Sequence, residues 1–284
     1  MIPPDSPASA DISILIPASN ESLWIGPCLD ALLAQTKGAG SMLVIVSTNA
    51  CHDDTAAQAL TRVQAFAARG SRLTVIDSTL PGKPGALNRA EAMADPGPRV
   101  YLDADVICTA DLIAQIRRAL ASHDPCYATG RLAIAPARSA VTRRYADLWR
   151  RLPFLRAGGT GAGFFAVNAA GRARWKAFPD VISDDTFVRL HFAPAERVEV
   201  TAGYIWPLPE GFANLVRVRR RQEDGVAELR RLMPDLFAND DTPILSPSQL
   251  FVLMARRPLD LAVYLAVRLA ARLRPAAKEW SRGR

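Results

Sequence analysis

The chain has 284 residues, of which 49% are hydrophobic, and it carries a formal net charge of +7. This length and composition allow a substantial core and exclude a low-complexity or disordered chain. No apolar stretch reaches the ~18 residues that a membrane span needs, and the first residues lack the basic and apolar regions of a signal peptide. The four scattered cysteines form no metal-binding pair, so we expect them to be reduced in a cytoplasmic protein.

In the first half of the chain, short β-branched runs at residues 11–16, 42–47, 72–77 and 99–103 alternate with helical patterns. Nearly continuous apolar runs are typical of strands that are covered on both faces. Strands that alternate with helices predict a parallel, doubly wound sheet. Ligands of such a sheet bind at the carboxyl ends of its strands, and three polar segments follow the strands there.

The second half of the chain is less regular. Its patterns predict two strands and three helices, at residues 126–134, 164–167, 139–156, 184–192 and 214–232. A glycine-rich segment, GGTGAG, precedes the second of these strands. It lacks the order of a dinucleotide-binding motif, so we expect its glycines to allow a close approach of the backbone.

The segment VYLDADVIC, residues 100–108, ends a hydrophobic run on Asp103 and Asp105. In a continuing strand, side chains two residues apart project to the same side. Two carboxylates that close need a proton, an arginine or a divalent cation between them. Their place at the ligand edge favours Mg²⁺ or Mn²⁺, which prefer hard oxygen ligands, over a solvated turn at a strand end.

Two further segments carry charged groups. Asp184 and Asp185 open a predicted helix, where they either cap the helix or place a general base in a cleft. Lys83 lies in the turn PGKPGALN, where a lysine beside exposed backbone N–H groups suits a phosphate. The alternative for Lys83 is an ordinary surface turn.

Taken in chain order, these segments resemble the motifs of family-2 glycosyltransferases. The seven matching stretches are residues 16–22, 49–55, 82–88, 102–105, 159–168, 184–190 and 217–225, within about residues 10–230. The resemblance implies an α/β protein of the GT-A fold, with a mixed sheet flanked by helices and a C-terminal helical tail. It also implies an inverting, metal-dependent enzyme that moves a sugar from a nucleotide-diphosphate sugar to an acceptor hydroxyl. The acceptor would be a glycan or a lipid-linked molecule of cell-envelope glycan, polysaccharide or glycolipid synthesis.

The resemblance assigns roles to individual residues. Asp185 would be the catalytic base, with Asp184 beside it where glutamate is commoner. Asp103 and Asp105 would hold Mg²⁺ or Mn²⁺. The residues expected to bind the nucleotide sugar are Pro17, Ala18, Glu21, Asn49, Lys83, Asp103 and Arg221.

Two departures from the family pattern narrow the expectation. Arg221 is all that remains of the QxxRW motif of processive members, which favours the transfer of a single sugar. Thr48 stands where many members have a base-recognising aspartate, so UDP is only the default choice over GDP.

We expect a catalytic domain at residues 1–238, with a nucleotide-sugar half at about 10–125 and an acceptor half at 126–238. Residues 239–284 would form a linker and a basic, amphipathic helical tail. From Leu250 onward, eight basic and two acidic residues contribute +6 of the net charge.

The helical part of this tail, residues 249–274, has two interpretations. Asp260, Arg268 and Arg272 fall on one stripe of an otherwise apolar helix, which either covers the catalytic domain or lies in a membrane interface. The basic residues favour an anionic membrane surface, here the cytoplasmic face of the inner membrane. They do not alternate with base-stacking aromatics, which argues against nucleic acid.

Three other functions use related residues. A phosphatase of the haloacid dehalogenase type would have its acidic pair on the first strand. A nucleotidyltransferase would need a glycine- and basic-rich first motif, which IPASNES does not provide. A non-catalytic nucleotide-sugar-binding protein is the remaining alternative, and the acidic residues Asp103, Asp105 and Asp185 argue against it.

Overall fold

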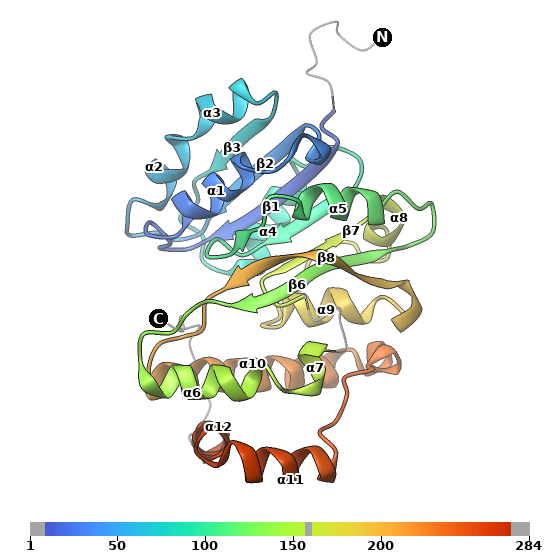
Figure 1. Ribbon diagram of the computed structural model, residues 1–284. Coiled ribbons are helices and arrows are strands. Elements are labelled where there is room, and N and C mark those ends of the chain that lie inside the picture. Colours follow the sequence, from blue (N-terminus) through green and yellow to red (C-terminus); the bar gives the residue numbers. More distant parts are fainter. Residues whose placement is uncertain (1–8, 157–160, 274–284) are drawn as a thin grey trace, which may run out of the picture.

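The computed structural model describes residues 9–156 and 161–273, which form one mixed sheet with helices on both faces (Figure 1). The strands have the order β3-β2-β1-β4-β7-β6-β8-β5. Their bounds are β1 Ile12–Ala18, β2 Met42–Thr48, β3 Arg72–Ile76, β4 Arg99–Leu102, β5 Ile107–Cys108, β6 Tyr127–Ile134, β7 Phe164–Val167 and β8 Arg197–Trp206.

Twelve α-helices lie within the described residues. Their bounds are α1 Ile25–Leu33, α2 Thr55–Leu60, α3 Val63–Ala68, α4 Lys83–Glu91, α5 Leu112–Ala119, α6 Ala140–Trp149, α7 Pro153–Arg156, α8 Ala169–Arg172, α9 Asp184–Leu190, α10 Phe212–Leu232, α11 Pro247–Arg256 and α12 Pro258–Leu273. Short 3₁₀ helices occupy Lys37–Ala39, Pro194–Glu196 and Pro234–Asn239.

The sheet is parallel in its first half and mixed in its second. Strands β3, β2, β1 and β4 pair in parallel, as the alternation of strands and helices predicts. Strand β7 then pairs antiparallel with both β4 and β6, β8 pairs parallel with β6, and β5 closes the edge antiparallel to β8. The expected α/β fold with a mixed sheet flanked by helices is therefore confirmed.

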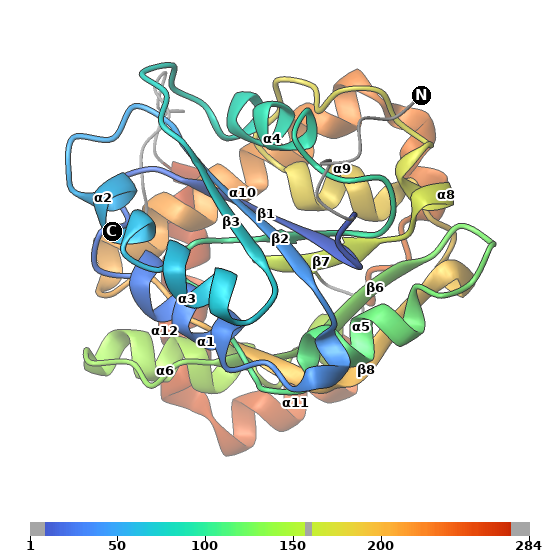
Figure 2. The same cartoon turned by 90° about the horizontal axis from the view of Figure 1, so that it is seen from above.

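Both faces of the central strands are covered. In β1, Ile14 and Ile16 face a core that includes residues of α1, α3 and α5, whereas Leu15 faces a second core with residues of α4 and α9. Figure 2 shows α1 to α3 on one side of the strands and α4 and α9 on the other. This alternation explains why β1 is apolar at nearly every position, with Ser13 as the exception.

Strand β8 was not expected from the sequence. Its apolar residues alternate along the chain, and Tyr204 and Trp206 pack against the first core. The period of two in Val198, Val200, Ala202, Tyr204 and Trp206 is the pattern of a half-covered strand. The strand carries Trp206 to the edge where the cleft described below opens.

The tail forms two helices that break at Pro258, and α12 packs on α6 and α10 in a third layer (Figure 1). Tyr264 and Val267 are buried there, and Asp260 is only 4% exposed because it pairs with Arg144. The expectation that the tail helix covers the catalytic domain therefore holds for one of its faces. The proposed boundary between domain and tail at residue 239 stays a prediction.

Among the described helices, none has the length and apolar character to cross a membrane. All four cysteines are free; three of them are buried, and Cys51 is partly exposed.

Candidate active site

A cleft of about 870 Å³ opens at the carboxyl ends of the parallel strands, with a smaller pocket of about 100 Å³ beside it. The residues that end or follow three of these strands line it: Pro17 on β1, Asn49 after β2 and Asp103 after β4. This is the edge where parallel α/β sheets bind ligands, because the loops that follow the strands gather there.

The two aspartates of the DAD segment lie on a turn. The predicted strand 99–103 ends at Leu102, and the backbone N–H of Val106 donates to the carbonyl of Asp103 at 3.1 Å. The premise that the strand continues through both aspartates is therefore wrong. The turn instead buries Ala104 and presents Asp103 and Asp105 to the same cleft.

The glycine-rich segment supports this turn from the neighbouring strand. The carbonyl of Gly163 accepts the backbone N–H of Asp103 at 2.9 Å. A Cβ at Gly163 would lie 2.9 Å from Trp206 and 3.0 Å from Val106, and its φ is +73°. The close backbone approach expected of these glycines is present at Gly163, whereas residues 158–160 lie outside the described part of the chain.

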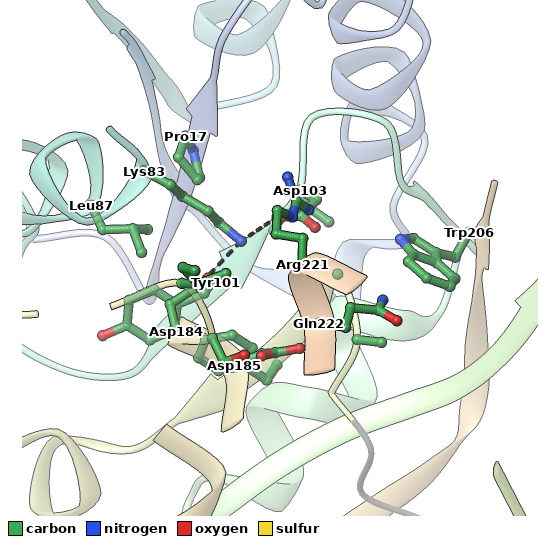
Figure 3. Close-up of a pocket in the computed structure, with 16 residues that line it drawn as sticks. Pro17, Lys83, Leu87, Tyr101, Asp103, Asp184, Asp185, Trp206, Arg221 and Gln222 are labelled. Atoms are coloured by element: carbon green, nitrogen blue, oxygen red, sulfur yellow. Dashed lines mark ion pairs between the residues drawn. The ribbon is translucent and has the colours of Figure 1, made fainter. Parts of the chain in front are cut away.

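Lys83 is the first residue of α4, directly after Gly82, whose φ of +106° turns the chain into the helix. Its ammonium lies 2.9 Å from a carboxylate oxygen of Asp103 and 3.0 Å from one of Asp184 (Figure 3). A lysine therefore pairs with Asp103 in this structure, and it joins Asp103 to Asp184. Burial alone would lower the pKa of Lys83, but the two carboxylates raise it above its ordinary value.

Asp184 and Asp185 begin α9, as predicted, and differ in environment. Asp184 is 5% exposed, and burial raises its pKa to about 6, even though Lys83 favours the ionised form. Asp185 is partly exposed and accepts the backbone N–H of Thr186 at 2.7 Å. Both carboxylates line the smaller pocket, side by side in Figure 3. The acidic start of α9 therefore lies in a pocket, and the N-cap residue, Ser183, makes no side-chain capping hydrogen bond.

Gly225 is a residue of this site that sequence reasoning did not single out. It lies inside α10, where glycine costs about 1 kcal/mol of helix stability relative to alanine. A Cβ at this position would lie 2.5 Å from the hydroxyl of Ser183 and 2.9 Å from Ile182. The glycine lets α10 pack directly on the segment that leads into Asp184 and Asp185.

The model of the family described as glycosyl transferase family 2 matches residues 13–175, more than half of the chain. The chain belongs to this family. It is a glycosyltransferase. No curated protein sequence matches the chain at a significant level.

Solved structures of glycosyltransferases share the fold. The mannosyltransferase PcManGT from Pyrobaculum calidifontis is 21% identical, with a TM-score of 0.56 over 96% of this chain and 78% of that one. S. aureus TarS is 14% identical, with a TM-score of 0.53 over 91% of this chain and 43% of that one. A shorter form, TarS 1-349, is 13% identical, with a TM-score of 0.52 over 91% of this chain and 72% of that one. At these identities the likeness shows the fold alone.

In this glycosyltransferase, two loops form the wall of the cleft at β1 and β2. Glu21 lines the cleft, and its N–H donates to the hydroxyl of Thr55 at 2.7 Å. Asn49 is 3% exposed, and its side-chain amide donates to the carbonyl of Ala18 at 3.0 Å. Ala18 does not line the cleft, because its side chain packs in the core. Among the residues predicted to bind the donor, Ala18 therefore contacts the site only through its backbone carbonyl, which holds the side chain of Asn49.

The opposite wall of the glycosyltransferase cleft comes from α10 and β8. Arg221 and Trp206 line both the cleft and the smaller pocket. Figure 3 shows Arg221 on its helix next to Asp103, with Trp206 beyond it. Thr48 is fully buried and donates to the carboxylate of Asp77, so it does not line the cleft.

The glycosyltransferase cleft carries an excess of acidic groups. Its basic side chains are Lys83 and Arg221, and its acidic ones are Glu21, Asp53, Asp103, Asp105, Asp180, Asp184 and Glu228. Within the described residues, no group of three or more His, Cys, Asp or Glu side chains could enclose a metal ion. The pair Asp103 and Asp105 suits Mg²⁺ or Mn²⁺, which accept two protein carboxylates and take further oxygens from substrate and water.

Proposed function

We propose that this glycosyltransferase moves one sugar from a nucleotide-diphosphate sugar to an acceptor hydroxyl, with inversion at the anomeric carbon and with a divalent cation. The observation that carries the proposal is the meeting of two acidic segments in one cleft. The Asp103–Asp105 turn lies at the end of β4, the Asp184–Asp185 pair begins α9, and Lys83 joins the two.

Charge supports the dependence on a cation. A diphosphate is itself an anion, and most of the charged side chains that line the cleft are carboxylates. Without a cation, a donor diphosphate beside Asp103 and Asp105 would meet strong repulsion. Mg²⁺ or Mn²⁺ held by these two residues would polarise the bond to the leaving diphosphate and offset its charge.

The remaining donor contacts follow from the walls of the cleft. Lys83 and Arg221 would pair with phosphate oxygens, since they are the basic side chains that line it. Pro17, Glu21 and Asn49 would contact the nucleoside from the loops after β1 and β2. Ala18 would hold Asn49 in place through its carbonyl.

Asp185 is our proposed catalytic base. It would take the proton of the acceptor hydroxyl while that oxygen bonds to the anomeric carbon from the face opposite the nucleotide. The bond from this carbon to the diphosphate oxygen breaks, and the nucleoside diphosphate leaves with its electron pair. Asp184, held by Lys83, would fix the start of α9 and thereby the position of Asp185.

A binding experiment can decide whether the donor sugar is carried by GDP or by UDP. PcManGT was solved with GDP-Man and Mn²⁺, and TarS 1-349 with UDP-GlcNAc. Both GDP- and UDP-sugars therefore belong in a thermal-shift screen of this protein with Mn²⁺ present. A donor that binds the folded protein raises its melting temperature by mass action.

The acceptor is a glycan or a lipid-linked molecule in our proposal, used in cell-envelope synthesis by an enzyme peripheral to the cytoplasmic face of the membrane. Single transfer is favoured because Arg221 alone remains of the processive motif. The lipid-linked acceptor is supported by the exposed apolar residues of the tail helices, Phe251 and Leu269 among them.

Replacing Asp185 with asparagine tests the function. We expect Asp185→Asn to lower the transfer rate by two orders of magnitude or more, because a general base typically contributes 10²–10⁴-fold. Donor binding with Mn²⁺ should remain within about threefold of wild type. The matched control is Asp224→Asn, an exposed aspartate of α10 that lines neither pocket.

The results of these assays distinguish the proposed sugar transfer from the alternative functions. Full activity of Asp185→Asn would contradict the assignment of the base, and loss of donor binding would place Asp185 in the donor site. A non-catalytic binding protein would bind a nucleotide sugar with Mn²⁺ and neither transfer nor hydrolyse it. A nucleotidyltransferase or phosphatase would instead release pyrophosphate from a nucleoside triphosphate or inorganic phosphate from a phosphate ester.

A further inference from the structure

The tail helices α11 and α12 have two different faces. The inner face of α12 packs on α6 and α10 through Leu261, Tyr264 and Val267, all less than 9% exposed. The outer face consists of apolar side chains that nothing in the described structure covers. Their exposed fractions are Phe251 66%, Val252 47%, Met254 48%, Leu259 60%, Leu265 51%, Leu269 58% and Leu273 74%.

The spacing of these residues makes a continuous stripe on α12. Leu265, Leu269 and Leu273 recur at intervals of four residues, which places them along one side of the helix, and Leu259 lies at the border of that side. Figure 1 shows α11 and α12 as the outermost layer of the molecule, on the far side of α6 and α10 from the sheet. A patch of this kind marks an interaction surface, because single exposed leucines are ordinary and a stripe of them is not.

Within the described residues, the charged side chains that α11 and α12 themselves expose are all positive. Arg256, Arg257 and Arg272 are exposed, whereas Asp260, which is the sole acidic residue from position 247 to 273, is buried against Arg144. Arg257 also lies 3.7 Å from Asp260. Folding therefore removes the negative charge from the outer face and leaves apolar side chains bordered by arginines.

We propose that the outer face of α11 and α12 docks on an anionic membrane surface, with its leucines among the acyl chains and its arginines at the headgroups. An amphipathic helix with apolar residues on one side and arginines beside them lies in the interface plane. Within the described residues the two helices have 10 and 16 residues, whereas a helix that spans a bilayer takes about 20. This inference deepens the proposed membrane location of the enzyme, and it does not depend on the chemistry of the cleft, because neither helix lines it.

A second copy of the chain is the competing occupant. If two copies paired through this apolar face, the arginines that surround it would lie opposite each other and repel. Anionic lipid headgroups would instead form ion pairs with these arginines. The charge pattern therefore favours an anionic membrane over a second copy of the chain.

The test is flotation of the full chain with vesicles of phosphatidylcholine alone or with 30% phosphatidylglycerol. We expect binding to the anionic vesicles, weaker binding to the neutral ones, and loss of binding as salt rises. The variant Leu265→Gln/Leu269→Gln should bind the anionic vesicles at least roughly tenfold less, because it withdraws two leucines from the interface. Arg256→Gln/Arg272→Gln should weaken binding to anionic vesicles and leave binding to neutral ones unchanged.

The matched control is Leu60→Gln/Leu232→Gln, which replaces two leucines of similar exposure, 55% and 49%, on α2 and α10. It should bind as wild type does. The proposal is overturned if wild type does not bind anionic vesicles, or if the leucine variant and wild type bind equally. It is also overturned if sedimentation shows a wild-type dimer that Leu265→Gln/Leu269→Gln dissociates. Thermal unfolding of each variant shows that it is folded, and turnover of a soluble acceptor reports the cleft separately.

Discussion

Replacing Lys83 with methionine should destabilise the protein by an amount that depends on pH. Methionine keeps most of the apolar stem and removes the ammonium that lies between Asp103 and Asp184. Asp103 has a side chain that is 34% exposed, so water can replace much of its lost partner, whereas the side chain of Asp184 is 7% exposed. The cost therefore comes mainly from Asp184.

The magnitude follows from the protonation of Asp184, whose pKa in the folded protein is about 6. At pH 8, two units above this pKa, the ionised form of Asp184 is more stable than the protonated form by about 3 kcal/mol. Without Lys83, Asp184 can take up a proton instead of remaining ionised, so the loss of stability at pH 8 is limited to about 3 kcal/mol. At pH 5.5 the carboxyl is already mostly protonated, and the loss falls below about 1 kcal/mol.

The sign is set by the direction of the shift. Burial raises the folded-state pKa of Asp184 above its ordinary 3.8. The folded state then binds this proton more tightly than the unfolded chain, so the contribution of Asp184 makes stability fall as pH rises from about 4 to about 6. Removing Lys83 raises that pKa further and extends the fall to higher pH.

Urea unfolding of wild type and Lys83→Met at pH 5.5 and pH 8 measures the effect. The double variant Lys83→Met/Asp184→Asn is the control. It has no carboxyl at position 184 that would lose its partner, so its stability loss should not depend on pH in this way. A loss of equal size at both pH values would refute the reasoning, since it would show that Lys83 acts through packing. So would a double variant that keeps the full pH dependence.

Two further changes test the site. Asp103→Asn and Asp105→Asn should each reduce the Mn²⁺-dependent thermal shift given by a nucleotide sugar by more than half; an unchanged shift would remove the pair from the cation site. Gly225→Ala should cost about 1–2 kcal/mol of stability and lower kcat, because its Cβ would press on Ser183 just before the acidic pair. Gly85→Ala, where the nearest atom lies at 3.4 Å, is the matched control in urea unfolding and should be neutral or stabilising; equal effects would show that the packing is not tight.

The parallel half of the fold was predictable because its strands are covered on both faces. Residues 42–46 of β2 are all apolar, so the strand can be recognised without a regular alternation of apolar and polar residues. Strand β8 was missed because its apolar residues alternate with polar ones across Arg197–Trp206. The alternation is visible in the sequence, but the charged residues Arg197 and Glu199 at the start of the strand and the glycine at position 203 resemble a loop.

The candidate site was predictable in its members and not in their arrangement. The positions of Asp103, Lys83 and Asp184 after strands or at helix starts place them at one edge of the sheet. Which carboxylate the lysine meets depends on how α4 and α9 pack across the cleft, over a separation of about a hundred residues. A close approach such as that of Gly225 to Ser183 likewise belongs to tertiary packing, which one sequence does not display.

The two like charges at the end of β4 can then be explained by an exchange of partners. In this structure Asp103 pairs with the ammonium of Lys83. Under the proposed function, a divalent cation binds Asp103 and Asp105, and a diphosphate provides new anionic partners for Lys83. Both exchanges replace one ion pair with another, so the buried charge of Asp184 keeps a cation close by throughout. The pH-dependent stability lost in Lys83→Met and the donor affinity that it should also lose therefore have one cause: the position of a single ammonium between two acidic segments.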